Sequence, residues 1–275
     1  MPLIADVEAG APEAICELAQ TGVSTTLLVN NKKPPFDNVK LRQAMALAVD
    51  RQGMIDILTL GKAKLSGVMM APPEGQWGMP MEMVMALPNY GSDQTAMRAE
   101  ARKIMENLGD GPNNRLKIKV STRDFQAYKD PAVLLVDKLN QIWFDAELEI
   151  VESAVWFGRL ARDDYAVALN LLGSGIDDPD VSLLESFACN SDRNYTKYCS
   201  PRVEKLLEEQ SIETDVAKRK LMVWQIEKIL AEDVVRPIIF HNRVATCWHP
   251  HVKGLVLHQN SIYNNWRLES VWLDR

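Results

Sequence analysis

Apolar positions along this chain repeat with two periods, and segments with one period interleave with segments with the other. In some segments an apolar residue recurs every three or four positions, which predicts amphipathic helices. Between them lie short runs of β-branched or alternating apolar residues, which predict strands. Helices are predicted over residues 38–49, 51–60, 93–108, 131–142, 156–161, 201–210 and 215–232, and strands over 25–30, 116–120, 147–151, 165–172, 237–240, 244–247 and 255–257. This alternation at crossover lengths indicates an α/β layered fold.

Polar and proline residues at the edges of these segments set where the helices are expected to begin. Asp37 is expected to cap the first predicted helix, and Asp50 the helix that follows it. Pro131 suits the first turn of its helix, because the N–H that proline lacks would remain unbonded there. The first 25 residues show no clear pattern, and the Met-, Pro- and Gly-rich residues 69–88 are expected to form a long irregular loop.

Length and composition are those of an ordinary soluble globule. The 275 residues suit one large domain or two modest ones, and 47% of them are hydrophobic and 25% charged. A net charge of −6 argues against nucleic acid or an anionic membrane as a partner. The sequence has no apolar run of membrane-spanning length. Its first residues lack the basic and apolar regions of a secretory signal, so an exported form is expected to come from a longer precursor.

The strongest candidate for ligand binding is the Gly- and Asp-rich loop that follows the predicted strand over 165–172. Backbone amides and carboxylates in such a loop stay open to a ligand, and strand ends in an α/β sheet border a crevice. Asp178 or Asp180 is expected to cap the next helix, with Pro179 stiffening the loop. Two further side chains follow another strand end. The predicted ligand-binding residues are Arg123, Tyr128, Gly173, Ser174, Gly175 and Asp177.

Motifs for catalysis or metal binding are missing from the sequence. The aspartates of residues 177–180 lack calcium-loop spacing, and the histidines have no adjacent acid or cysteine, so surface or core positions suit them better. No Gly-x-Ser-x-Gly elbow, phosphate-binding loop or nucleophile–base pair is present. An enzyme therefore has the least support from the sequence, and no catalytic residue, metal site or cofactor is expected.

Two of the four cysteines are close in sequence. Cys189 and Cys199 flank a polar loop, which favours a disulfide and an oxidising compartment over a pair of buried thiols. Cys16 and Cys247 are far apart in sequence, and their state stays open.

Three stretches resemble one protein family. The first runs over 30–55 and contains Pro35-Phe36-Asp37; the second combines residues 177–180 with 194–199; the third runs over 219–254. Together they are similar to the extracytoplasmic solute-binding proteins of ABC importers, in the dipeptide, oligopeptide and nickel class known as family 5. The resemblance covers about residues 20–275.

This resemblance implies a periplasmic-binding-protein-like lobe with a mixed sheet flanked by helices. It implies that residues 1–25 are the tail end of a first lobe, 26–240 a second ligand-binding lobe, and 241–275 a segment returning to the first. Such a protein is a periplasmic monomer that captures a small solute, peptide or peptide-like, in the cleft between its lobes. It closes by a hinge motion and delivers the solute to a membrane permease.

The chain departs from the peptide-binding pattern at two positions. Where those members carry an aspartate for the ligand's α-ammonium group, this chain has Gly175, and in place of their tryptophan it has Leu172. Asp177 is a candidate replacement for the acid. The alternatives left open are an opine, sugar conjugate or nickel chelate as the solute, and, in another class, a chaperone-like domain that holds peptides.

Overall fold

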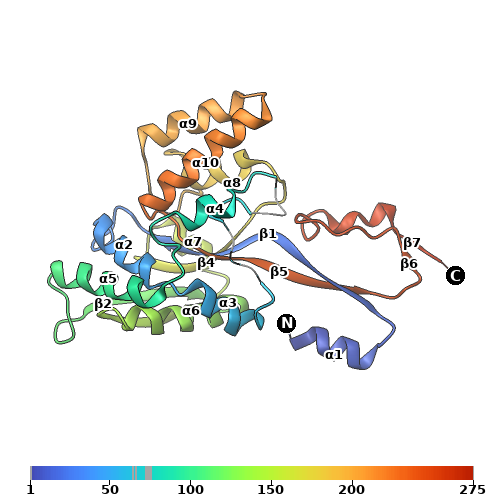
Figure 1. The fold of residues 1–275 in the computed structure, drawn as a ribbon, viewed down its shortest axis with the longest axis horizontal. Coiled ribbons are helices and arrows are strands. Elements are labelled where there is room, and N and C mark those ends of the chain that lie inside the picture. Colours follow the sequence, from blue (N-terminus) through green and yellow to red (C-terminus); the bar gives the residue numbers. More distant parts are fainter. Residues whose placement is uncertain (1, 64, 66, 72–75, 275) are drawn as a thin grey trace.

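The computed structural model describes residues 2–63, 65, 67–71 and 76–274, and it contains a mixed five-stranded sheet in the order β3-β2-β4-β1-β5 (Figure 1). Strand β2 runs parallel to both β3 and β4, whereas β1 runs antiparallel to both β4 and β5. The fold is α/β, as the sequence pattern predicts. The bounds are Ile15–Val29 for β1, Leu116–Arg123 for β2, Phe144–Val151 for β3, Val167–Gly173 for β4 and Ile238–Trp248 for β5.

Helices cover both faces of the sheet. On one face, apolar side chains of four helices pack with the sheet in one buried cluster. On the other, a second cluster joins the helices that follow β4 to the short helix α4 (Figure 1). The first group comprises α2 (Val39–Ala48), α3 (Arg51–Thr59), α5 (Gln94–Asn107) and α6 (Gln126–Asn140); the second comprises α4 (Met81–Met85), α8 (Pro179–Phe187), α9 (Pro201–Ile212) and α10 (Val216–Glu232). The remaining elements are α1 (Pro2–Gly10), α7 (Trp156–Ala161), β6 (Val252–Lys253), the 3₁₀ helix η1 (Asn265–Ser270) and β7 (Trp272–Leu273).

Strands β1 and β5 continue beyond the sheet as a two-stranded ribbon (Figure 1). Only residues 23–29 of β1 pair with β4, while residues 15–20 pair with β5 alone. The register shifts between Gln20 and Ser24, at the point where the ribbon leaves the sheet. Near the far end, the directly paired Cys16 and Cys247 form a disulfide.

Several predicted element boundaries are wrong, each for a local reason. Asn38, not Asp37, caps α2, since its side chain accepts a hydrogen bond from the Lys40 N–H at 2.9 Å. Helix α6 begins at Gln126, so Pro131 lies inside it. A proline there leaves one carbonyl of the preceding turn without its helical donor, and exposure of that turn lets water replace it.

The ends of the chain also differ from the prediction. The first 25 residues form α1 and most of β1, and the two strands predicted over 237–247 are one continuous strand, β5. The half of β1 inside the ribbon is partly exposed on both faces, and such a strand lacks clean apolar alternation. Residues 255–257 form no strand, and α4 interrupts the loop expected over 69–88. None of the helices described in residues 2–274 is both long and apolar enough to cross a bilayer.

Candidate ligand-binding site

Strands β2 and β4 end at Arg123 and Gly173, and in their register Thr122 pairs with Leu169, so β4 runs about three residues further. Because the two strands are parallel neighbours, their carboxyl ends lie at the same edge of the sheet. The Arg123 Nε donates to Ser153 Oγ at 2.9 Å, which holds the side chain against the loop between β3 and α7. Its guanidinium carbon lies 5.7 Å from the ring centroid of Tyr128 and 5.9 Å from that of Phe157. At these distances both ring faces attract the cation.

Tyr128 follows the end of β2 and lies in the first turn of α6. Its side chain is buried, and its ring meets that of Phe125 edge to face at 6.3 Å. The backbone carbonyl of Tyr128 also accepts a hydrogen bond from the Thr122 hydroxyl. The buried ring of Tyr128 is therefore one of the two rings that the Arg123 guanidinium group contacts.

Tyr263, from the C-terminal part of the chain, packs against Gly173 and Gly175. A Cβ atom at Gly173 would overlap the Tyr263 hydroxyl, and one at Gly175 would lie 3.3 Å from the Tyr263 Cβ. Burial, together with the nearby Tyr128, raises the pKa of the Tyr263 hydroxyl. We refer to Arg123, Tyr128, Gly173, Gly175 and Tyr263 as the strand-end site. Sequence reasoning missed Tyr263; its only signal is an aromatic residue in the polar segment 258–265.

Ser174 and Asp177 lie beside a second, smaller hollow. The Ser174 N–H donates to the Gly22 carbonyl at 3.2 Å, which ties the loop to β1. The Asp177 carboxylate accepts from the Gln76 N–H at 3.2 Å. Between them lies a cavity of about 20 Å³, which is room for one water molecule. Gly22 and the segment 69–71 form its other walls.

Two buried ionisable groups hold the wall formed by segment 69–71. Glu227 accepts hydrogen bonds from the Met69 and Met70 N–H groups, each at 2.7 Å, and a ring nitrogen of His241 lies 3.3 Å from the Met69 carbonyl oxygen. Burial raises the pKa of Glu227 to about 8, although these amides oppose the shift. Burial also lowers the pKa of His241 to about 4. Both groups are therefore largely uncharged near pH 7.

The other two aspartates of the loop have structural partners. Asp178 caps α8 and receives two hydrogen bonds from Arg219, at 2.9 and 3.0 Å. Asp180 accepts from the Ser211 hydroxyl at 2.7 Å. The sequence predicts such a cap at one of these two residues, and the structure has it at Asp178.

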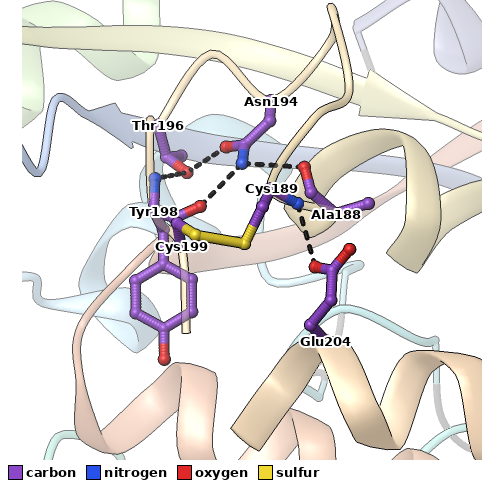
Figure 2. The surroundings of a disulfide bond; sticks show 7 residues. All are labelled: Ala188, Cys189, Asn194, Thr196, Tyr198, Cys199 and Glu204. Atoms are coloured by element: carbon purple, nitrogen blue, oxygen red, sulfur yellow. Dashed lines mark hydrogen bonds between the residues drawn. A yellow bond between two sulfur atoms is a disulfide. The ribbon is translucent and has the colours of Figure 1, made fainter. Parts of the chain in front are cut away.

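The disulfide between Cys189 and Cys199 lies at the opposite end of β4 from the strand-end site. Asn194 donates to the carbonyls of Tyr198 at 2.7 Å and Ala188 at 3.2 Å, and the Cys189 N–H donates to Glu204 at 2.9 Å (Figure 2). Residue 196 of this loop bonds the backbone after the end of β1, where β1 pairs with the start of β4. The bridge therefore stabilises a loop far from the strand-end site.

The structure thus brings Arg123 and Tyr128 together, and it brings Gly173 and Gly175 against Tyr263, which lies near Tyr128. Ser174 and Asp177 line the smaller hollow. A cavity of about 580 Å³ lies elsewhere, between α1, α3, α6 and the strands β1 and β5, and none of the six predicted residues lines it. Among the described residues, no group of three or more His, Cys, Asp or Glu side chains is arranged to hold a metal ion.

Comparison with known proteins gives a consistent family. Residues 5–194 match the model of the bacterial extracellular solute-binding proteins, family 5 Middle. A probable D,D-dipeptide-binding periplasmic protein, DdpA of Escherichia coli, is 27% identical over 236 residues, which cover 84% of this chain and 43% of that protein. The periplasmic oligopeptide-binding protein OppA of Haemophilus influenzae is 29% identical over 231 residues, which cover 82% of this chain and 41% of that protein.

Solved structures show the same fold. The crystal structure of Haemophilus influenzae OppA in complex with the peptide RPPGFSPFR matches with a TM-score of 0.82 at 22% identity, covering all of this chain and 52% of that one. The Escherichia coli murein tripeptide binding protein MppA matches with a TM-score of 0.83 at 17% identity, covering 99% of this chain and 52% of that one.

The chain spans less than half the length of these two curated relatives and about half that of the two solved structures. Because the family model covers well over half of its residues, the chain belongs to the bacterial extracellular solute-binding proteins of family 5, a family of solute carriers rather than enzymes.

Proposed function

We propose that this chain forms the second ligand-binding lobe of the substrate-binding component of an ABC importer. In this proposal residues 26–240 make up the lobe, residues 1–25 are the tail end of a first lobe, and residues 241–275 return to that first lobe. Strands β1 and β5 support this division, because they leave the sheet side by side as a ribbon, as a double crossing between two lobes requires.

The returning segment meets the strand ends at Tyr263, and this contact carries the proposal. Tyr263 belongs to the returning segment, whereas Gly173 and Tyr128 belong to the second lobe. A solute held at this junction touches both parts, so its binding favours the conformation in which they are close. In this proposal Arg123, Tyr128, Gly173 and Gly175 face the solute at the strand-end site, and Ser174 and Asp177 contact it from the smaller hollow beside that site.

The solute is small, and either a peptide or peptide-like. The names of the relatives support this, since they specify a D,D-dipeptide and an oligopeptide for those proteins. The loaded, closed form docks on a membrane permease, and the protein works as a monomer in the periplasm. Two disulfides suit that oxidising compartment.

Titration of one small-solute library into this chain and into the full-length protein tests the proposal. We expect the full-length protein to bind at least one solute in the micromolar range, and this chain to bind the same solute beyond the millimolar range. The difference arises because the first lobe supplies part of the contacts, and each tenfold in affinity corresponds to about 1.4 kcal/mol. Equal affinities would place the whole site in this chain and contradict a site shared between two lobes.

A further inference from the structure

The cavity of about 580 Å³ between α1, α3, α6, β1 and β5, which we call the back cavity, lies on the side of the ribbon away from the smaller hollow. Phe240 and Asn242 of β5 line the back cavity, whereas His241, between them, lines the smaller hollow beside Ser174 and Asp177. Successive side chains of a strand point to opposite faces. The back cavity and the smaller hollow therefore lie on opposite faces of β5, and Figure 1 shows α1 and η1 on opposite sides of the ribbon.

The back cavity borders the one irregular stretch of pairing between the two halves of the ribbon strands. Residues 21–23 of β1 lie opposite a single residue of β5, Asn242, between the paired positions on either side. Unequal pairing of this kind is a β-bulge, which bends a strand and interrupts its ladder of hydrogen bonds. The Asn242 carbonyl accepts a hydrogen bond from the Thr21 hydroxyl at 3.0 Å. We expect the ribbon to flex at this bulge.

The walls of the back cavity come from both sides of the bulge. Ile4 and Val7 belong to α1, which leads into the far end of the ribbon, whereas Leu58 and Pro131 belong to α3 and α6, which pack on the sheet. A bend that brings the two lobes together on the opposite face moves α1 away from α3 and α6. The reverse bend, which opens the lobes, moves α1 toward these helices and narrows the back cavity.

The lining of the back cavity is mainly apolar and carries no net charge. Its charged residues, Asp130 and Arg243, are opposite in sign. The Asp130 carboxylate accepts from the Gln126 amide, and Arg243 donates to a backbone carbonyl of β1 at 2.9 Å. The Asn242 carboxamide accepts from the Thr25 hydroxyl at 2.9 Å and has N–H donors of its own. This lining suits an uncharged apolar molecule with one hydrogen-bonding oxygen better than it suits an ion.

We propose that the back cavity is a second binding site, for a neutral apolar molecule with one hydrogen-bonding oxygen, and that its occupant favours the closed form of the protein. A molecule in this cavity resists the approach of α1 to α3 and α6 that opening requires. Occupant and solute then favour the same conformation, so each raises the affinity of the protein for the other. The effect on the solute rests on the proposed function, whereas the binding of the apolar molecule does not.

Octanol and two charged counterparts test the binding in the chain as it exists. 1-Octanol, octanoate and octylammonium are each titrated into protein with ¹³C-labelled valine and leucine methyl groups, which are followed by NMR. We expect saturable shifts centred on Val7, Leu58 and Val244 with 1-octanol. Both ions should bind about tenfold or more weakly, because burial of an unpaired charge is costly.

Ala127 and Ala99 offer a matched pair of variants for this titration. Both are exposed alanines of long helices, α6 and α5, but only Ala127 lines the back cavity. Ala127→Trp should weaken the binding of 1-octanol about tenfold or more by filling the space, whereas Ala99→Trp should leave it unchanged. Circular dichroism checks the folding of both variants. No saturable shift, shifts centred on other residues, or ions that bind as well as 1-octanol would overturn the inference in the unsubstituted chain alone.

The effect on the solute is tested in the full-length protein, by titration with a solute that it captures, with and without saturating 1-octanol. We expect the solute to bind about fivefold or more tightly when 1-octanol is present, and Ala127→Trp to abolish this gain. An unchanged or weakened affinity for the solute would overturn the coupling. A full-length protein that binds no 1-octanol would overturn the second site, because other parts of the protein would then cover the cavity.

The proposed function fails separately from this inference. If 1-octanol binds in the back cavity but the full-length protein captures no solute, the second site stands and the transport function is wrong. If the full-length protein captures a solute with the same affinity in the presence and absence of 1-octanol, the transport function stands and the coupling is wrong.

Discussion

The hydroxyl group of Tyr263 occupies the space that a side chain at position 173 would need. The two residues come from the end of β4 and from the segment before η1, so this contact joins the C-terminal part of the chain to the strand ends. Glycine is required at position 173 for as long as Tyr263 keeps this position.

Replacement of Gly173 by alanine should therefore destabilise the protein by about 1–3 kcal/mol, the usual cost of overpacking. In a Tyr263→Ala background the same change should cost much less, because the obstructing atoms are gone. Urea denaturation of the wild type, both single variants and the double variant gives the coupling energy. Additive effects would show that the two residues do not touch.

Glu227 should make stability depend on pH in the neutral range. Its folded pKa of about 8 lies above the ordinary value of 4.5, so the folded state holds the proton more tightly than the unfolded state. The stability from this group is complete below pH 4.5 and is lost as pH rises through about 8, with a slope of at most about 1.4 kcal/mol per pH unit.

The variant Glu227→Gln should flatten the dependence of the free energy of unfolding on pH in the neutral range. His241 acts in the opposite direction at lower pH, since its folded pKa of about 4 lies below 6.5 and its contribution is lost as pH falls between these values. Free energies of unfolding are therefore compared between pH 7 and pH 9. Parallel profiles of variant and wild type in that range would exclude a raised pKa at Glu227.

Asp178 should contribute both as a helix cap and as the partner of Arg219. Burial alone would raise its pKa, but the hydrogen bonds from Arg219 and from the backbone of residue 180 lower it below the usual value. Asparagine retains the cap and loses the charge, whereas alanine loses both. We expect Asp178→Ala to cost about 1–2 kcal/mol and Asp178→Asn roughly half of that. Thermal unfolding measures the loss of stability in each variant. Equal losses in the two variants would mean that capping contributes nothing.

The two disulfides should differ in their effect on stability. The Cys16–Cys247 bridge closes a loop of 231 residues, and the Cys189–Cys199 bridge a loop of 10. In the chain-entropy model, replacing the first pair by serine should cost about 5 kcal/mol and the second about 3 kcal/mol. A thiol assay on denatured, unreduced protein should find no free cysteine. A larger loss from the Cys189/Cys199 pair would reverse the expected order.

Features set by neighbours in sequence could be predicted from the sequence, and those set by distant contacts could not. The caps at Asp50 and Asp178 depend on side chains that reach the next turn; the first was predicted correctly, and the second was predicted as one of Asp178 and Asp180. Helix α6 begins five residues before Pro131 because its apolar face packs on the sheet, which outweighs the preference of proline for a first turn.

At the candidate site, the local pattern predicted the end of β4 to within one residue, whereas β2 runs to Arg123, three residues beyond its predicted end at residue 120. Tyr263 could not be predicted, because it packs on glycines that carry no hydrophobic signal and lies on a segment remote in sequence. The ribbon of β1 and β5 escaped prediction for a similar reason, since its pairing joins the two ends of the chain.

The position of β5 in the sheet also affects when the chain can fold during its synthesis. β1 ends at Val29, but the strand that covers its outer edge begins only at residue 238. At usual rates of translation that edge stays open for on the order of ten seconds or more. An open strand edge is a site for pairing with other chains. The outer edge of β1 is therefore open to pairing with other chains until β5 has been made.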